Sequence, residues 1–261
     1  MSRKTELALV LAAFAHEGQT DKAGVDYIEH PKTVAATFTD ENRIIVALLH
    51  DVLEDTFVTE STIRNLFGDE IADACRALTH ADGEPYLDYV QRAIGNPIAR
   101  DVKKADLLNN MDLKRLPIIT AQDTKRIREK YIPALELIMK HEEGQKNATH
   151  EFALKWLKKF GDEAIDKREL LGEDMFDDCK RLGFEMDCGH AFGEEYGTAA
   201  SECEDLRRVI DQVTDIQLLG SAIFSQWRYF NHWADPGEDI CAPENRFWFI
   251  IALNRLAELT C

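Results

Sequence analysis

The sequence predicts an all-α protein, in which a helical domain is followed by a smaller helical accessory domain. Two observations support this fold class. Apolar residues recur at spacings of three and four over 7–15, 44–52, 63–78 and 133–139, which is the pattern of helices that bury one face. Alternating strand patterns are nearly absent, and Gly or Pro residues such as Gly18, Pro31 and Gly68 fall between the periodic segments, as helix connections require.

The apolar pattern lapses in the polar stretch 141–147, with the sequence HEEGQKN. We therefore place a domain boundary near 145–150, which predicts one domain over 1–145 and a second over 150–261. In the second domain the pattern predicts further helices over 151–160, over 202–233 with breaks, and over 243–259.

The composition is that of a soluble globular protein, with 45% hydrophobic residues and a formal net charge of -17. This charge argues against nucleic acid or anionic lipid as a partner, because those partners require a basic face. A phosphate substrate would have to be bound locally, by metal ions or by a few well-placed Lys and Arg side chains.

No apolar run approaches the roughly 20 residues of a membrane helix, and no signal peptide precedes the first helix. The six cysteines are irregularly spaced in a chain that does not need disulfides to fold, which favours reduced thiols. These features predict a cytoplasmic protein.

The segment 44–56, with the sequence IIVALLHDVLEDT, is the most informative part of the chain. On one continuous helix His50 would lie one turn from Glu54, and Asp51 one turn from Asp55, so that both pairs would face the same way. An imidazole beside a carboxylate can bind a divalent cation. For an isolated His-Asp dipeptide, however, the ordinary interpretation is a helix end with solvated charges.

Two further segments make the ordinary interpretation less attractive. His30 lies at a turn before a predicted helix, and Asp106 lies one helical turn before Asn110 on the same face. Each would be unremarkable alone. Their order along the chain, together with the 50–55 cluster, indicates a site for one metal ion.

This ordered set resembles the hydrolase domain of the Rel/SpoT family and the stand-alone small alarmone hydrolases. The resemblance covers residues 5 to about 140. It is carried by AHEGQ at 15–19, YIEHP at 27–31, ALLHDVLEDT at 47–56, FG at 67–68, LT at 78–79, KKAD at 103–106, and Asn110.

The resemblance implies an HD domain that removes pyrophosphate from the 3′ position of (p)ppGpp, which gives GDP or GTP. It implies one bound manganese ion, and two carboxylates that position and activate the attacking water. The metal ligands that it implies are His30, His50, Asp51 and Asp106, and the two carboxylates are Glu54 and Asp55. This agrees with the chemistry of the residues, because a divalent cation acidifies water and a nearby carboxylate can take the proton.

The family's substrate-binding residues are matched less completely in this sequence than its metal ligands. The family has an Arg-Lys pair after the Gly-Gln element, and here the pair is Asp21 and Lys22, so that the arginine of nucleotide recognition is missing. The residues that match remaining substrate contacts are Lys22, Asn110 and Tyr131. The implied partner is a small phosphorylated nucleotide.

Two other functions compete with (p)ppGpp hydrolysis. The departure at Asp21 favours an HD phosphohydrolase that acts on a different phosphorylated nucleotide. The chain could also be a catalytically silent nucleotide-binding regulator, although the intact Glu54 and Asp55 pair argues against this.

The predicted accessory domain has no motif of comparable strength. Cys179, Cys188, His190 and Cys203 could bind zinc, but they lack the paired short spacings of zinc sites. The aromatic residues of 227–233 and 247–251 could stack on a base, although such clusters are more often core.

Overall fold

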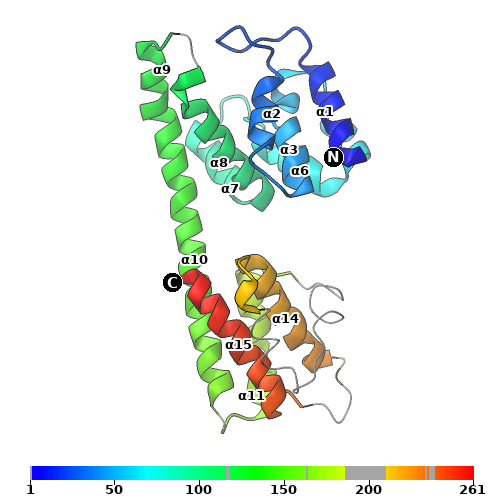
Figure 1. Cartoon of the computed structure of the whole chain (residues 1–261), viewed down its shortest axis with the longest axis vertical. Coiled ribbons are helices and arrows are strands. Elements are labelled where there is room, and N and C mark those ends of the chain that lie inside the picture. The colour runs from blue at the N-terminus through cyan, green and yellow to red at the C-terminus, as the bar shows by residue number, and fades with distance from the viewer. Residues whose placement is uncertain (1, 116–117, 163, 186–209, 233, 235–238) are drawn as a thin grey trace. The chain divides into compact units, whose positions relative to one another are not determined.

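The computed structural model describes residues 2–115, 118–162, 164–185, 210–232, 234 and 239–261. Within these ranges every regular element is a helix, apart from an isolated antiparallel bridge between Thr20 and Asp26. The predicted all-α fold is therefore confirmed for the described residues. The chain divides into two compact units, Met1–His141 and Glu142–Cys261 (Figure 1).

Short helices make up most of the first unit. They are α1 (Arg3–Ala15), α2 (Glu29–Ala35), α3 (Glu41–Leu49), α4 (Val52–Asp55), α5 (Glu60–Phe67), α6 (Asp69–Leu78), α7 (Tyr86–Ile94), α8 (Pro97–Met111), the 3₁₀ turn η1 (Leu113–Arg115), α9 (Ala121–Arg126) and the π-helical turn η2 (Ile127–Tyr131). Helix α10 (Ile132–Gly161) begins in the first unit and ends in the second.

Capping residues fix where these helices begin. The side chains of Ser2, Asp40 and Thr59 each accept a hydrogen bond from a backbone N–H in the first turn of α1, α3 and α5. Asn96 does the same for α8, where Pro97 occupies the first helical position and needs no N–H partner. Each such cap contributes about 1 kcal/mol, and together they set the starts of the helices that carry the site.

Helix α3 is the central helix of the first unit. Its residues 45–49 are all buried, and it packs against α1, α2, α6 and α8. A helix that is apolar on every side has to be enclosed in this way. His50 directly follows α3 and is only 4% exposed, so that the packing of this helix carries a polar side chain into the interior.

Two of the predicted helices are interrupted. The helix predicted through 44–56 ends at Leu49, and α4 starts at Val52 after a turn in which the N–H groups of Glu54 and Asp55 both donate to the Asp51 carbonyl oxygen. The segment 63–78 is split between α5 and α6 at Gly68, whose φ of 98° is unfavourable for any residue with a side chain. The expectation of one continuous helix under His50 and Glu54 is therefore wrong.

The polar stretch 141–147, from which we placed the domain boundary near 145–150, is helical and lies inside α10. Its polar character reflects exposure rather than a loop, because most of these residues are exposed or half-buried.

In the second unit the remaining described helices are α11 (Lys167–Leu170), α12 (Glu173–Arg181), α14 (Ile216–His232) and α15 (Pro243–Thr260).

Aromatic side chains form the core of the second unit. Trp156, Trp227 and Phe249 are completely buried, and the Trp227 indole N–H donates to the Leu170 carbonyl oxygen at 2.9 Å. Phe160 and Phe249 stack with ring centroids 4.3 Å apart. The base-stacking interpretation of this aromatic block is therefore wrong for these residues, which pack against one another.

Cys179, one of the four residues weighed as zinc ligands, is a buried thiol whose sulfur lies 3.7 Å from the Met175 sulfur. Cys188, His190 and Cys203 lie outside the described residues. Cys75, Cys241 and Cys261 are also free thiols. Among the described helices, none has the length and apolar character to cross a membrane.

Candidate metal centre

Three helices of the first unit bring metal-binding side chains to one point. His30 comes from α2, His50 from the end of α3, and Asp106 from the middle of α8, and one donor atom from each lies within 4.8 Å of the others. Asp51 adds a second carboxylate. Its Oδ2 lies 3.0 Å from His50 Nε2 and 3.8 Å from His30 Nε2.

The spacing of these donors fits a single divalent cation. Asp106 Oδ1 lies 3.2 Å from His30 Nε2 and 3.8 Å from His50 Nε2. Ligands bound about 2.1 Å from one ion in tetrahedral or octahedral geometry are themselves about 3.0 to 3.5 Å apart. The four side chains could therefore contact a common centre with small adjustments.

The outer nitrogens of both histidines are already occupied. His30 Nδ1 lies 2.8 Å from Asn109 Oδ1, and His50 Nδ1 lies 2.8 Å from the Ala47 carbonyl oxygen. Donation from Nδ1 in each ring directs the Nε2 lone pair toward the centre, which is the usual arrangement around metal-bound histidines. His50 Nε2 is buried without a well-formed hydrogen bond, and a cation would satisfy it.

The charges in the centre are strongly coupled. Burial opposes the charged form of His50, but the carboxylates of Asp51 and Asp106 outweigh burial and raise the histidine pKa to about 9. Burial would raise the pKa of Asp51, yet the charge and hydrogen bond of His50 lower it to about 2. Metal binding must therefore displace a proton from His50 at neutral pH.

Two neighbouring side chains on α8 hold the carboxylate oxygens of Asp106. Lys103, one turn earlier on α8, donates to Asp106 Oδ2 at 2.9 Å, and Asn110, one turn later, donates to Oδ1. Burial would raise the pKa of Asp106, but the neighbouring lysine and histidine charges lower it well below its usual range. Asp106 is therefore an anion, as a metal ligand must be.

Tyr27 positions Asp51. Its hydroxyl donates to Asp51 Oδ2 at 2.6 Å, and its ring packs between His16 and His30 with centroid distances of 4.8 and 5.8 Å. Burial and the nearby Asp51 charge raise the pKa of Tyr27 far above its ordinary value, so that the hydroxyl keeps its proton and remains a donor.

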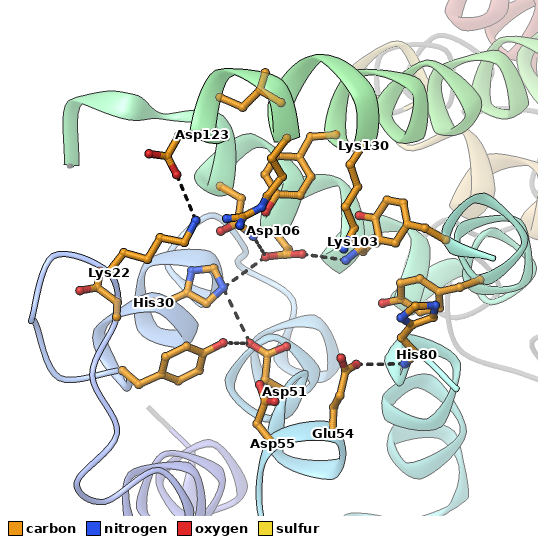
Figure 2. Close-up of a pocket in the computed structure, with 18 of the residues that line it drawn as sticks. Lys22, His30, Asp51, Glu54, Asp55, His80, Lys103, Asp106, Asp123 and Lys130 are labelled. Carbon is orange, nitrogen blue, oxygen red and sulfur yellow. Dashed lines mark hydrogen bonds and ion pairs between the residues drawn. The ribbon is translucent and has the colours of Figure 1, made fainter. Parts of the chain in front are cut away.

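Two more carboxylates stand beside the donor cluster. Glu54 Oε2 accepts a hydrogen bond of 3.0 Å from the backbone N–H of His80. Asp55 lines the same pocket, and partial desolvation together with the charges of Asp51 and Glu54 raises its pKa. A carboxylate with a raised pKa accepts a proton more readily than an ordinary one. Figure 2 shows Asp51, Glu54 and Asp55 side by side.

One pocket of about 380 Å³ in the first unit is lined by His30, Asp51, Glu54, Asp55 and Asp106, while His50 is buried and is not among its lining residues (Figure 2). Acidic side chains lie at the metal-centre end, and basic and aromatic side chains lie on the walls contributed by other elements. The pocket is lined by Thr20, Asp21, Lys22, Tyr27, His30, Asp51, Glu54, Asp55, His80, Tyr86, Tyr89, Lys103, Asp106, Asn110, Leu113, Asp123, Arg126, Ile127, Lys130 and Tyr131.

The three side chains predicted to contact substrate all line this pocket. Tyr131 belongs to η2, and Asn110 reaches the pocket while it also donates to Asp106. Lys22 is 53% exposed and forms an ion pair of 3.1 Å with Asp123. Asp21 is turned into its own loop, where its Oδ1 accepts hydrogen bonds from the N–H groups of Ala23 and Val25.

Sequence reasoning missed several residues of the pocket. Tyr27 and Lys103 each lie three residues before a predicted ligand, and on a helix this spacing alone would have suggested the Lys103 contact with Asp106. Four other lining residues carry no local sequence signal, because they reach the pocket only through the folding of the chain. They are His80 in the loop after α6, Tyr86 at the start of α7, Arg126 at the end of α9 and Lys130 in η2.

Residues 8–129 match the family model described as the HD domain. Among curated proteins, the bifunctional (p)ppGpp synthase/hydrolase SpoT of Escherichia coli strain K12 is 36% identical over 90 residues, which cover 33% of this chain and 13% of that protein. The guanosine-3′,5′-bis(diphosphate) 3′-pyrophosphohydrolase of Haemophilus influenzae is 32% identical over 117 residues, which cover 39% of this chain and 17% of that protein.

The GTP pyrophosphokinase of Myxococcus xanthus is 41% identical over 76 residues, or 28% of this chain and 10% of that protein. The chain thus spans less than a fifth of each of these relatives. A solved structure titled "A metazoan ortholog of SpoT hydrolyzes ppGpp and plays a role in starvation responses" aligns with 54% of this chain and 97% of that one, at 25% identity and a TM-score of 0.41.

The whole pocket lies in the first unit, and the family match, which ends at residue 129, covers all of its lining residues except Lys130 and Tyr131. The first unit of this chain therefore carries an HD domain that is homologous to the SpoT and Rel proteins.

Proposed function

We propose that this chain is a metal-dependent phosphohydrolase that removes the 3′-pyrophosphate from (p)ppGpp, with manganese as the ion. The observation that carries the proposal is the convergence of two kinds of group on one pocket. His30, His50, Asp51 and Asp106 supply a donor set for one cation. Glu54 and Asp55 stand beside it with carboxylates suited to proton transfer.

The residues divide the chemistry between them. When bound, a divalent cation supplies Lewis acidity, which draws charge from phosphoryl oxygens and makes water more acidic. Glu54, held by the His80 N–H, orients the attacking water. Asp55, whose pKa is raised by burial and by its neighbours' charges, accepts the proton. Lys22 and Tyr131 contact the nucleotide from the rim of the pocket.

One observation favours a second candidate, a phosphohydrolase that acts on another phosphorylated nucleotide. Asp21 replaces the arginine that the family uses for nucleotide recognition, and its carboxylate is already committed to the N–H groups of Ala23 and Val25. It therefore offers neither a planar cation nor a free hydrogen-bonding group to a purine base. Another nucleotide that presents a phosphate ester to the same carboxylates would fit this loop equally well.

The deciding experiment is a substrate panel. Purified protein with Mn²⁺ would be incubated with ppGpp, pppGpp, NADPH and ordinary nucleotides, and the products resolved by chromatography. We expect pyrophosphate and GDP or GTP from the alarmones. Asp106→Asn is the control for contaminating phosphatases and should release nothing. Turnover of another nucleotide in preference to the alarmones would support the second candidate, and no turnover of any substrate would contradict both.

A further inference from the structure

The π-helical turn η2 forms the wall of the pocket that faces the metal-centre end. Its first carbonyl oxygen, that of Ile127, accepts a hydrogen bond from the N–H of Ile132, five residues later. This wide turn lets Arg126 and Tyr131, which are also five residues apart, line the same pocket. π-Helical turns are rare and occur frequently at functional sites, so this wall is a candidate for ligand binding.

Cations on the two faces of this segment have different partners. Lys125 and Arg128 point away from the pocket, and both form ion pairs with Glu129, at 3.8 and 3.0 Å. Arg126 and Lys130 line the pocket, and within the described part of the chain neither forms an ion pair. The outward charges are neutralised by the protein and the inward charges are not.

An aromatic ring holds one of the inward cations in place. Lys130 Nζ lies 4.0 Å from the centroid of the Tyr86 ring, and Lys103 Nζ lies 5.7 Å from the same centroid. A ring face attracts an ammonium group without neutralising its charge, and it leaves N–H groups free to donate. Figure 2 shows the Lys130 side chain descending into the pocket from the ribbon above it.

The positive charges of Lys103, Arg126 and Lys130 also repel one another. Burial lowers the pKa of Lys130, and the charges of Lys103 and Arg126 lower it further. Lys103 already has a carboxylate partner in Asp106, whereas Arg126 and Lys130 line the pocket and form no ion pair among the described residues. An anion between them would relieve this repulsion, and a phosphate would suit both the planar guanidinium and the compact ammonium.

We propose that Arg126 and Lys130, with Tyr86 beneath the lysine, form an anion subsite for a second phosphate group of the substrate. This group stays attached to the nucleoside while the phosphate at the metal centre is cleaved. The inference rests on the proposed function, because it assumes that the metal-centre end of the pocket receives the scissile phosphate. Such a subsite would favour substrates that carry phosphate groups at two separate positions of the nucleoside.

The first test measures anion binding without chemistry. Protein freed of metal with EDTA would be titrated with pyrophosphate by calorimetry. Loss of one charge-assisted contact should weaken binding about 10-fold or more for Lys130→Met and for Arg126→Met. The matched control is Lys125→Met, which removes a charge from the outward face and should bind as the wild type does. Thermal unfolding of each variant checks that it is folded. Equal affinity in all four proteins would overturn the subsite.

The second test uses two substrates that differ only at the remote position. Guanosine 3′-diphosphate lacks the 5′ phosphates of ppGpp. We expect the loss of kcat/KM in Lys130→Met to be at least about 10-fold larger for ppGpp than for guanosine 3′-diphosphate. Equal losses for both would place Lys130 at the scissile group and overturn the proposal.

The two proposals can fail separately. If the wild type hydrolyses neither guanosine substrate, the proposed function fails, and the pyrophosphate titration alone decides the subsite. If the wild type hydrolyses both substrates while Lys130 and Arg126 have no effect on pyrophosphate affinity, the function stands and the subsite fails.

Discussion

The two ends of the pocket are built in different ways. At the metal-centre end, His30, His50 and Asp106 extend from packed helices, and their outer atoms are held by Asn109, Ala47 and Lys103. At the opposite end, Lys22 lies on a loop and is paired with Asp123. Arg126 ends α9 and Lys130 lies on η2, and neither has a carboxylate partner among the described residues. At the metal-centre end, which we call the rigid end, the outer atoms of the donors are hydrogen-bonded within the protein, whereas the other end carries charge that a ligand could use.

This difference indicates which part of the pocket can change its substrate specificity while the metal-binding residues stay the same. A ligand set that is packed into the core tolerates little substitution, because each side chain is positioned by several others. Loops and helix ends tolerate more. The departure at Asp21 lies in such a loop, and the metal-binding pattern is intact. The predictions below test whether the two ends are as separable as their construction indicates.

The largest effect is expected when a donor is removed from the rigid end. His50→Ala deletes one of the two imidazoles and leaves Asp51 and Asp106 facing each other, so that metal affinity should fall by more than about 100-fold. Metal analysis of Mn²⁺-loaded wild type should give about one equivalent of ion, and the variant should retain little. A wild-type stoichiometry near two would contradict the single-ion site.

Glu54→Gln separates metal binding from the orientation of the attacking water. The amide loses the negative charge and one of the two acceptor oxygens that can hold water, yet its remaining oxygen can still accept the His80 N–H, so that the fold and the donor cluster should be unchanged. We expect turnover to fall about 100-fold while metal content stays at the wild-type level. Glu6→Gln, an exposed substitution on α1, is the matched control. Wild-type turnover in Glu54→Gln would remove Glu54 from the mechanism.

Tyr27→Phe tests the support of the rigid end. Loss of the hydrogen bond to Asp51 should weaken Mn²⁺ binding about 10-fold, because partners of metal ligands commonly have effects of this size. Metal affinity can be measured directly by titration. Thermal unfolding in EDTA separates this effect from general destabilisation. An unchanged affinity would show that the His50 contact is sufficient to position Asp51.

The smallest effect is on the pH dependence of stability in metal-free protein. His50 has its pKa raised from 6.5 to about 9, so that its contribution is complete below pH 6.5 and is lost as pH rises through 9. Asp51 has its pKa lowered from 3.8 to about 2, so that its contribution is present above pH 3.8 and is lost as pH falls through 2. Denaturant unfolding in EDTA should show lower stability at pH 9 than at pH 6.

Asp51→Asn is the matched comparison for this titration, because it removes the main charge that holds the His50 proton. The loss of stability between pH 6 and 9 should be smaller in this variant than in the wild type. A loss of the same size in both proteins would assign the alkaline change to other groups.

Much of the rigid end could be predicted from the sequence. His50 and Asp51 are adjacent in the chain, so that local spacing groups these two residues. His30 and Asp106 are added by the order of the motifs along the chain and by the family resemblance. The structure brings these side chains together, but the backbone conformation differs from the predicted one. The chain turns at Asp51 between α3 and α4 instead of continuing as one helix. No local sequence pattern predicts that turn.

The other end could not be predicted in the same way. Whether Lys130 or Lys125 faces the pocket depends on the extra residue in the turn of η2, and helical periodicity assumes that no such residue is present. The direction of Asp21 depends on backbone N–H groups two and four residues later in a loop. Both features arise from backbone geometry, which side-chain spacing does not encode.

The equal mixture of imidazole and carboxylate at the centre has a consequence for how the protein is handled in the laboratory. Two nitrogen and two oxygen donors bind late first-row ions such as zinc or copper more tightly than manganese. Protein from an ordinary expression culture would therefore carry whichever ion was most available, and added manganese would exchange with it slowly. Stripping the protein and reloading it under defined conditions should precede any comparison of substrates, because a low rate could reflect the wrong ion.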